Sequence, residues 1–446
     1  MSYYNINSIK SKKNPNSNSK FYQDSGNKVT AIAGKPSYTQ NNKTSTISKV
    51  YDNLSSETSL GKKLLSKSVM PDYDFEDIYD NDNLKYKNNK SNKNNYNNND
   101  YNNSNDYYNK TTTINRELNS IINSTVGLTN LGNTCFMNTC LQNLIHSEDF
   151  INRLLSKKSS ISRSTPISYY FFELCQEMSI SKRSVSPNKF KEKFGLKHHL
   201  FAGYGQNDTQ EFCRVLLEDM NTELNEVKRK KPYVELKTSG KSKIQCDREF
   251  DENFRGRENS IVMDSFYGQI INIFTCKCGF KDYSFQKILD LPLLLQTSGS
   301  LDIDGLLEDY FEEEVIKFET KCEKCGKKRD HVKEIKFSQP PNILILSLQR
   351  INPRTKRKNN CSVAFPKKLD INKYIDDECG HAKEGEYILY GIGNHSGSIN
   401  FGHYYAYIKL NDKYWYEFND SYVRKISEGI DTKSTQVYTL FYKKRI

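Results

Sequence analysis

The chain has 446 residues, of which 36% are apolar, and its mean hydropathy is −0.79. Lys and Arg number 66 against 54 Asp and Glu, which gives a formal charge of +12. No apolar run approaches the ~20 residues of a membrane-spanning helix, so an integral membrane protein is excluded and no membrane partner is expected. The low hydropathy also predicts that part of the chain has no packed core.

The first 124 residues are predicted to be a disordered, Asn-rich N-terminal region. They contain no cysteine, and 14 of the 29 residues from Asn81 to Asn109 are asparagine. Such a tract has no helical or alternating period and buries too little apolar surface to offset the entropy lost on ordering. The region has 17 basic and 12 acidic residues, and the remainder of the chain has 49 basic and 42 acidic residues. Because the net charges, +5 and +7, are both modest, no nucleic acid is expected as a partner.

Residues 125–446 are predicted to form one α+β domain. Helical periodicity dominates from Cys135 to about Val227, and runs rich in Val, Ile and Tyr dominate from about Ile261 onward. Asn342–Leu348 and His403–Leu410 are the clearest predicted strands. Two basic runs, 227–232 and 353–360, are interpreted as solvated loops.

All eleven cysteines lie at Cys135 or later. The first residues of the chain lack the apolar stretch of a secretory signal, so reduced thiols are expected, and with them a cytoplasmic or nuclear location. Reduced cysteines in such a protein act as packing residues, metal ligands or a nucleophile.

Cys135 is the candidate nucleophile. It lies after a Gly-rich turn and at the first turn of a predicted helix, whose apolar face begins at Phe136. The free N–H groups and positive dipole end of a helix start favour a thiolate and can hold an oxyanion. Either Asn130 or Asn133 is placed to add a side-chain donor, and the residues alone do not decide between them. On the helix signal alone, a packing role for Cys135 is the simpler interpretation.

Four further cysteines form two pairs with the spacing of metal ligands. Cys276 and Cys278 are a C-x-C pair, Cys322 and Cys325 are a C-x-x-C pair, and a glycine follows each pair. Two such pairs predict a structural zinc ribbon ligated by four thiolates. The short first pair leaves open the alternative of a ribbon that has lost its metal.

His403 is the candidate general base among the seven histidines. It stands at the start of a predicted strand, and the preceding Gly402 leaves room for an extended substrate backbone. The predicted hairpin returns through Asn419 and Asp420, either of which can fix the imidazole tautomer. His395 is the rival base, with a supporting role expected.

Four stretches of the chain together resemble ubiquitin-specific proteases (the USP family), which are papain-like cysteine deubiquitinases. They are the Cys135 segment, Gly205–Met220, Ser260–Ile270 and the C-terminal part that contains His403, and they occur in the family's order. The resemblance implies a papain-like USP fold with a helical thumb, a β-rich palm and zinc-ribbon fingers. The family's fingers usually contain two C-x-x-C pairs, so the first pair here is one residue short.

The resemblance also implies a role for each candidate residue. Cys135 matches the nucleophile, His403 the general base and Asn419 the residue that orients it. Asn130 matches the oxyanion-hole side chain, and Asp420 becomes a supporting residue.

The implied reaction is hydrolysis of the bond between the C-terminal glycine of ubiquitin and a lysine amine, through a thioester on Cys135. Ubiquitin and ubiquitinated proteins are therefore the expected partners. Ubiquitin's tail carries two arginines before Gly-Gly, and Asp208 and Glu211 match family positions expected to contact that tail. The alternatives are a protease for another ubiquitin-like modifier and a non-catalytic ubiquitin-binding protein.

Overall fold

The structure, a computed structural model, describes residues 112–295, 301–317, 321–352, 357–379, 384–398 and 401–445, together with Thr355 and His381. The Asn-rich tract and the rest of residues 1–111 lie outside this described part, and so does the prediction that they are disordered. None of the helices in the described ranges has the length and apolar character needed to cross a membrane.

The folded part begins earlier than the sequence predicted. Residues 112–122 are helical, although the predicted boundary at residue 124 puts them in the disordered segment. Leu118 and Ile121 are buried in the core, and Ile114 and Ile122 pack against it. These four positions have the i, i+4, i+7, i+8 spacing of an amphipathic helix. Next to the asparagine-rich tract, this short apolar pattern was not recognised as a helix. The predicted start of the folded domain, after residue 124, is therefore one helix too late.

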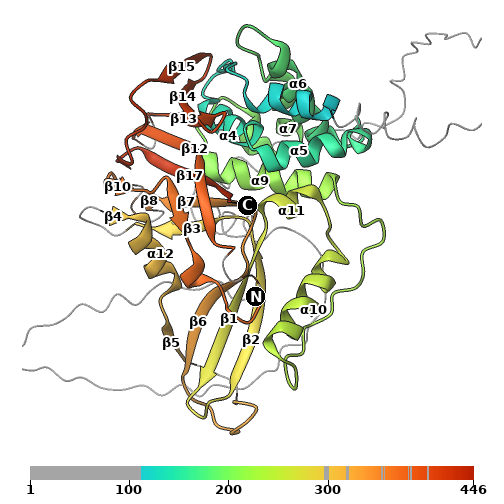
Figure 1. Ribbon diagram of the computed structural model, residues 1–446, viewed down its shortest axis with the longest axis vertical. Coiled ribbons are helices and arrows are strands. Elements are labelled where there is room, and N and C mark those ends of the chain that lie inside the picture. Colours follow the sequence, from blue (N-terminus) through green and yellow to red (C-terminus); the bar gives the residue numbers. More distant parts are fainter. Residues whose placement is uncertain are drawn as a thin grey trace, which may run out of the picture. The chain divides into compact units, whose positions relative to one another are not determined.

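The predicted order, helices before strands, is confirmed, and with it the α+β class (Figure 1). The helices that precede the strands are α4 (Cys135–Ile145), α5 (Glu148–Ser156), η1 (Lys158–Ser160), α6 (Pro166–Ile180), α7 (Asn188–Lys197), α8 (His199–Ala202), α9 (Thr209–Glu223), α10 (Lys243–Arg255) and α11 (Ile261–Phe266). Every residue of α4 is buried. A helix covered on all sides has to lie between two layers, which α4 does.

An eight-stranded sheet covers the other side of α4, which contacts three of its strands. The strand order is β15 (Tyr422–Ile426), β14 (Tyr414–Asn419), β13 (Gly402–Leu410), β12 (Glu386–Gly397), β17 (Val437–Lys444), β7 (Ile343–Gln349), β3 (Leu291–Leu294), and β11 (Lys368–Asp370) pairs with β12. Neighbours are antiparallel except for the parallel β3–β7 pair. The two strands predicted most clearly are confirmed as β7 and β13.

A separate four-stranded sheet lies beyond this layer, at the bottom of Figure 1. Its order is β2 (Lys281–Ile288), β1 (Gly268–Cys276), β6 (His331–Gln339), β5 (Glu314–Ile316). Helix α10 packs on one face of it, where Phe250 stacks on Phe285 with ring centroids 5.7 Å apart. The remaining elements are short: β4 (Leu301–Asp302), α12 (Ile303–Phe311), β8 (Ile351–Asn352), β9 (Arg357–Lys358), β10 (Val363–Ala364), η2 (Asn372–Tyr374) and β16 (Lys433–Ser434).

The position of α4 between helix and sheet explains how distant parts of the sequence meet. One buried cluster joins α4 and α9 to Tyr390 of β12 and Tyr404 of β13. Burial of this apolar surface fixes α4 against β13. The first residue of α4 and the second residue of β13 are thereby brought together, so that their side chains interact.

Candidate active site

Cys135 is the first residue of α4 and is only 4% exposed. The turn before it has positive φ at Gly132 (97°) and Asn133 (54°), which glycine and asparagine tolerate best. Thr134 is the N-cap, but its hydroxyl accepts a hydrogen bond from Leu131 N (2.8 Å) instead of capping the helix. Within the described residues the Cys135 N–H donates no hydrogen bond. That group is therefore available to a substrate oxygen.

His403 is brought to Cys135 by the packing of β13 on α4. The interaction with the Cys135 side chain raises the pKa of His403 to about 9, against the opposing effect of partial burial. The hydrogen bond with Asn419 raises the same pKa further, and the charge of Asp420 does so too. The raised pKa means that this site favours the imidazolium form of His403.

Asn419 is hydrogen-bonded to the imidazole of His403. Its Oδ1 lies 2.7 Å from His403 Nε2, and an amide oxygen only accepts, so Nε2 carries the proton. This leaves Nδ1 of His403 for Cys135. The hairpin predicted to bring the two residues together is confirmed by the antiparallel pairing of β13 with β14.

Asp420 lies outside the hydrogen-bonding range of the imidazole, 3.9 Å from His403 Nε2. Its carboxylate accepts hydrogen bonds from Asn130 Nδ2 (2.9 Å) and Asn138 Nδ2 (2.7 Å). Its backbone oxygen accepts one from Leu128 N (2.9 Å). Asp420 thus ties the loop before Cys135, the helix α4 and the end of β14 to one another.

The two candidate oxyanion donors differ in their surroundings. Asn130 Oδ1 accepts from Gly132 N (3.0 Å) and Thr134 N (3.1 Å), while one of its two Nδ2 protons goes to Asp420. The amide of Asn130 is thereby held rigidly, and its second proton has no partner among the described residues. Asn133 instead donates to Tyr204 O (2.7 Å), away from the helix start.

Gly402 is placed where a side chain cannot be accommodated. A Cβ there would lie 2.0 Å from His395 Nε2. The peptide groups of Gly402 pair with the Gln206 side chain, which donates to Gly402 O (3.2 Å) and accepts from Gly402 N (3.4 Å). An extended peptide would use the same backbone groups.

His395, the rival base, is 2% exposed. Burial lowers the pKa of His395 to about 4, and the charges of Lys358, His403 and Arg350 lower it further. Its ring packs on Tyr404 with centroids 4.3 Å apart. An imidazole that stays neutral at ordinary pH and is sealed in by aromatic rings suits the expected supporting role.

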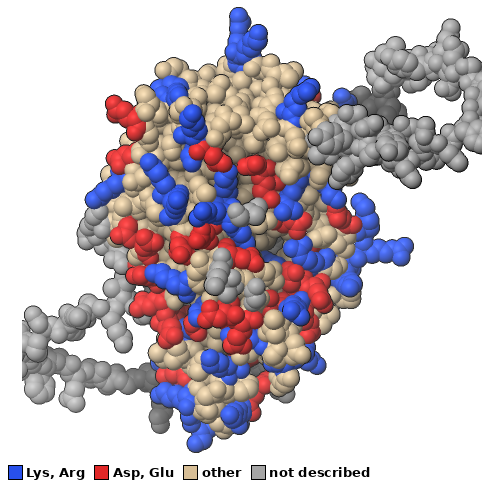
Figure 2. Space-filling model, viewed as in Figure 1, with Lys and Arg blue, Asp and Glu red and all other residues tan. Residues whose placement is uncertain are grey.

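The two acidic residues expected to contact an arginine-rich tail are in different situations. Asp208 is the N-cap of α9, where its Oδ1 accepts from Gln210 N (2.7 Å), and its Oδ2 accepts from the Tyr438 hydroxyl. Glu211 is half-buried, and burial followed by the charge of Asp208 raises its pKa. Within the described ranges no cation or donor pairs with the Glu211 carboxylate. On the face viewed in Figure 2, acidic side chains crowd the middle of the view.

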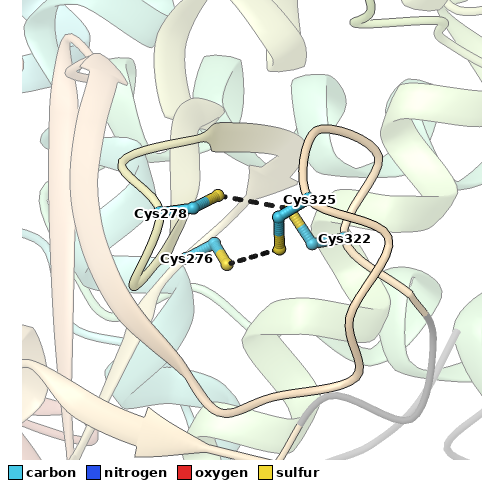
Figure 3. Close-up of side chains that lie close together, drawn as sticks. All are labelled: Cys276, Cys278, Cys322 and Cys325. Carbon is cyan, nitrogen blue, oxygen red and sulfur yellow. Dashed lines mark hydrogen bonds between the residues drawn. The ribbon is translucent and has the colours of Figure 1, made fainter.

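The two cysteine pairs meet at the end of the four-stranded sheet (Figure 3). Their four sulfur atoms lie within 4.8 Å of one another, with Cys276–Cys325 at 4.0 Å and Cys278–Cys322 at 3.7 Å. Thiolates ~2.3 Å from a tetrahedral zinc lie about 3.8 Å apart, so the donor set fits. Backbone N–H groups of Cys325 and then Lys324 lower the pKa of Cys322 to about 6, which favours a thiolate ligand. The short C-x-C pair therefore does not prevent a four-thiol arrangement.

Comparison with known proteins identifies the family. Residues 126–442 match the family described as ubiquitin carboxyl-terminal hydrolase. Over 341 residues the chain is 33% identical to ubiquitin carboxyl-terminal hydrolase 2 of Gallus gallus, which covers 72% of this chain and 94% of that protein. The chain belongs to the ubiquitin carboxyl-terminal hydrolase family.

Longer members of the ubiquitin carboxyl-terminal hydrolase family are also similar. Drosophila melanogaster Usp2 is 32% identical over 330 residues, covering 71% of this chain and 34% of that protein. Human ubiquitin carboxyl-terminal hydrolase 21 is 29% identical over 355 residues, covering 71% of this chain and 61% of that protein. The chain thus spans about a third of the fly relative and about three-fifths of the human one.

Solved structures show a similar fold. The SAGA Ubp8/Sgf11/Sus1/Sgf73 DUB module bound to ubiquitin aldehyde matches with a TM-score of 0.58 and 25% identity, over 73% of this chain and 71% of that chain. A second structure of the module, bound to monoubiquitin, matches with a TM-score of 0.58 and 24% identity, over 73% and 70% of the two chains. The second likeness concerns the fold alone.

Sequence reasoning missed three polar residues around the site of this ubiquitin carboxyl-terminal hydrolase family member. Lys358 lies in a basic run interpreted as a solvated loop, but its ammonium donates to the carbonyls of His395 (2.8 Å) and Gly397 (3.1 Å). Burial lowers the pKa of Lys358 to about 8, so the solvated interpretation is wrong for this residue. Gln206 contacts Gly402, and Glu417 contacts Asn419. No residue pattern in a single sequence indicates either contact.

Proposed function

We propose that this chain is a thiol-dependent deubiquitinase that cleaves the bond between the C-terminal glycine of ubiquitin and a lysine amine. The observation that carries the proposal is the convergence of Cys135, His403 and Asn419, from a helix start and two paired strands, in a member of the ubiquitin carboxyl-terminal hydrolase family. The similar solved module at 25% identity is bound to ubiquitin aldehyde, which supports ubiquitin as the substrate.

The chemistry is acyl transfer in two steps. The Cys135 thiolate attacks the glycine carbonyl, and His403 gives the proton on Nδ1 to the departing lysine amine. Water, deprotonated by the now neutral imidazole, then attacks the thioester and releases ubiquitin with a free carboxylate. Asn419 keeps the proton on Nε2 during both steps because its oxygen accepts from that nitrogen.

The oxyanion that forms in each step is stabilised by two groups at the helix start. They are the free N–H of Cys135 and the unused Nδ2 proton of Asn130. Because Asp420 and the turn hold the Asn130 amide in place, little reorganisation is needed as charge develops. This arrangement favours Asn130 over Asn133, whose amide is engaged with Tyr204.

The four cysteines at the end of the four-stranded sheet would hold a structural zinc ion. Two turns, each followed by a glycine with positive φ, present Cys276 and Cys278 from one side and Cys322 and Cys325 from the other. The metal would cross-link the β1–β2 turn to the segment before β6, with no part in the chemistry at Cys135.

A protease for a different ubiquitin-like modifier and a non-catalytic ubiquitin-binding protein remain the alternative functions. A complete set of catalytic groups disfavours the binding protein. The even charge split of the sequence gives no reason to add nucleic acid as a partner, and a cytoplasmic or nuclear location is proposed from the reduced cysteines.

The function is tested by incubating the chain with lysine-linked di-ubiquitin and, in parallel, with isopeptide conjugates of other ubiquitin-like modifiers. Release of mono-ubiquitin, measured by gel or mass spectrometry, is the expected result. Cleavage of another modifier with no cleavage of di-ubiquitin would select the first alternative, and binding without cleavage of any conjugate would select the second.

Glu211→Gln is expected to raise KM for a ubiquitin substrate about 5- to 20-fold, with a smaller change in kcat. The Glu211 carboxylate is half-buried beside Asp208 and has no cation of its own in the described part of the chain, so a guanidinium of the tail would relieve its desolvation. Steady-state kinetics with wild-type ubiquitin measure the effect.

This prediction has two controls: a variant of the neighbouring carboxylate, Asp208, and a ubiquitin substrate that lacks the two tail arginines. Asp208→Ala removes a helix cap and is expected to lower the free energy of unfolding by about 1 kcal/mol. With ubiquitin whose two tail arginines are alanine, Glu211→Gln should no longer change KM. An equal KM increase with both ubiquitins would show that Glu211 does not contact the arginines.

A further inference from the structure

Glu417 stands two residues before Asn419 on β14 and faces the same side of the sheet. Its cross-strand neighbours on that face are Tyr407 of β13 and Arg424 of β15. The residue is only 8% exposed. A carboxylate this buried, next to the residue that orients His403, requires a physical explanation.

Both oxygens of this carboxylate are in use. Oε2 accepts from Arg424 Nε (3.0 Å) and from a terminal nitrogen of the same guanidinium (2.6 Å). Oε1 accepts from Asn419 Nδ2 (3.4 Å). On the other side of the amide, Asn419 Oδ1 meets His403 Nε2 at 2.7 Å.

The contact with Glu417 selects one of two amide orientations. An asparagine amide has nearly the same shape when its oxygen and nitrogen exchange places. An ionised carboxylate only accepts hydrogen bonds, so the amide has to turn its nitrogen toward Glu417 and its oxygen toward His403. In the flipped orientation an oxygen would face the carboxylate, and the amide protons would face the proton on Nε2.

We propose that Glu417, anchored by Arg424, is a positioning residue that fixes the amide orientation of Asn419 and thereby the tautomer of His403. This role in catalysis rests on the proposed function. The reactivity of Cys135 beside His403, however, can be measured without ubiquitin. Among the described residues, other titratable groups lie close to the side chains of Glu417, Asn419 and His403. They are Tyr405, Tyr407 and Asp420.

A plain cross-strand ion pair is the competing explanation for Glu417. The Arg424 side chain is 56% exposed, and pairs of this kind contribute little to stability. If Glu417 served only that pair, its effect on the site would not depend on which residue stands at position 419. Replacement of Asn419 by aspartate separates the two explanations, because a carboxylate has two equivalent oxygens and no orientation to select.

The test is a double-mutant cycle of Glu417→Gln and Asn419→Asp. The readout is the rate of Cys135 alkylation by iodoacetamide near pH 7, mapped by mass spectrometry, with kcat on a ubiquitin substrate as the second readout. With Asn419 present, Glu417→Gln is expected to slow alkylation about 3- to 10-fold and to lower kcat with little change in KM. In the Asn419→Asp background, the same change should slow alkylation much less, because aspartate has no amide orientation for Glu417 to select.

This dependence on residue 419 supports the proposal, because a folding defect caused by Glu417→Gln would slow alkylation in both backgrounds. A Glu417→Gln effect of the same size in both backgrounds, or no effect in either, overturns it. Glu428→Gln, an exposed change after β15, is the matched control and should leave alkylation unchanged in both backgrounds. If the wild type fails to cleave ubiquitin, the proposed function fails while the alkylation cycle still decides the role of Glu417.

Discussion

Replacing Cys135 by alanine is expected to lower kcat on a ubiquitin substrate at least about 10,000-fold, because no other group in the site can form the thioester. Affinity for ubiquitin should change little, since the thiol is 4% exposed and contributes little contact surface. Turnover of a fluorogenic ubiquitin substrate measures the first quantity, and binding of labelled ubiquitin to the variant measures the second.

Cys361→Ser is the matched control for this loss. Cys361 is also a free thiol, but it lies in the segment before β10 and outside the site. Its replacement should leave kcat within about twofold of the wild type. Residual turnover of the Cys135→Ala variant at a tenth of the wild-type rate or more would show that another nucleophile or an activated water does the chemistry.

Removal of a cysteine from the four-thiol cluster is expected to have the second largest effect. Purified wild type should contain about one equivalent of zinc, and Cys322→Ser should retain much less, because three thiolates and a water hold the ion more weakly. Loss of the cross-link between β1 and the segment before β6 should lower Tm by roughly 5–10 °C. Metal analysis and thermal unfolding measure the two effects.

Cys361→Ser again serves as the control, because it removes one thiol without touching the cluster. It should keep the full zinc content. Wild-type protein purified without chelators that contains no zinc would refute the metal site, and the four cysteines would then be packing residues of a metal-free turn.

The sequence predicted which candidate residues lie together because each of them has a local signal. Cys135 follows a Gly-Asn turn at the start of an apolar helix, and His403 begins a strand whose hairpin partner contains Asn419. These signals come from short-range rules of turns, helices and strands. The choice of Asn130 over Asn133 had no such signal and came from the family resemblance, and the hydrogen bonds of the structure favour the same residue.

The features that the sequence did not predict depend on contacts between distant residues. The helix at 112–122 is stabilised by packing on the core, which composition could not reveal next to an asparagine-rich tract. Lys358 is only partly exposed and donates to two carbonyls at the end of β12, in spite of its basic neighbours. Asp208 caps its helix and accepts a hydrogen bond from Tyr438, so both of its carboxylate oxygens are already in use.

The most direct test of the proposed function is covalent capture of the nucleophile. Wild-type protein is incubated with ubiquitin whose C-terminal carboxylate is replaced by a thiol-reactive electrophile, and the adduct is measured by intact mass and peptide mapping. The site geometry predicts one ubiquitin per chain, attached to Cys135, and no adduct with Cys135→Ala. Absence of an adduct with the wild type, or attachment to any other cysteine, would contradict the assignment of Cys135 as the nucleophile of a deubiquitinase.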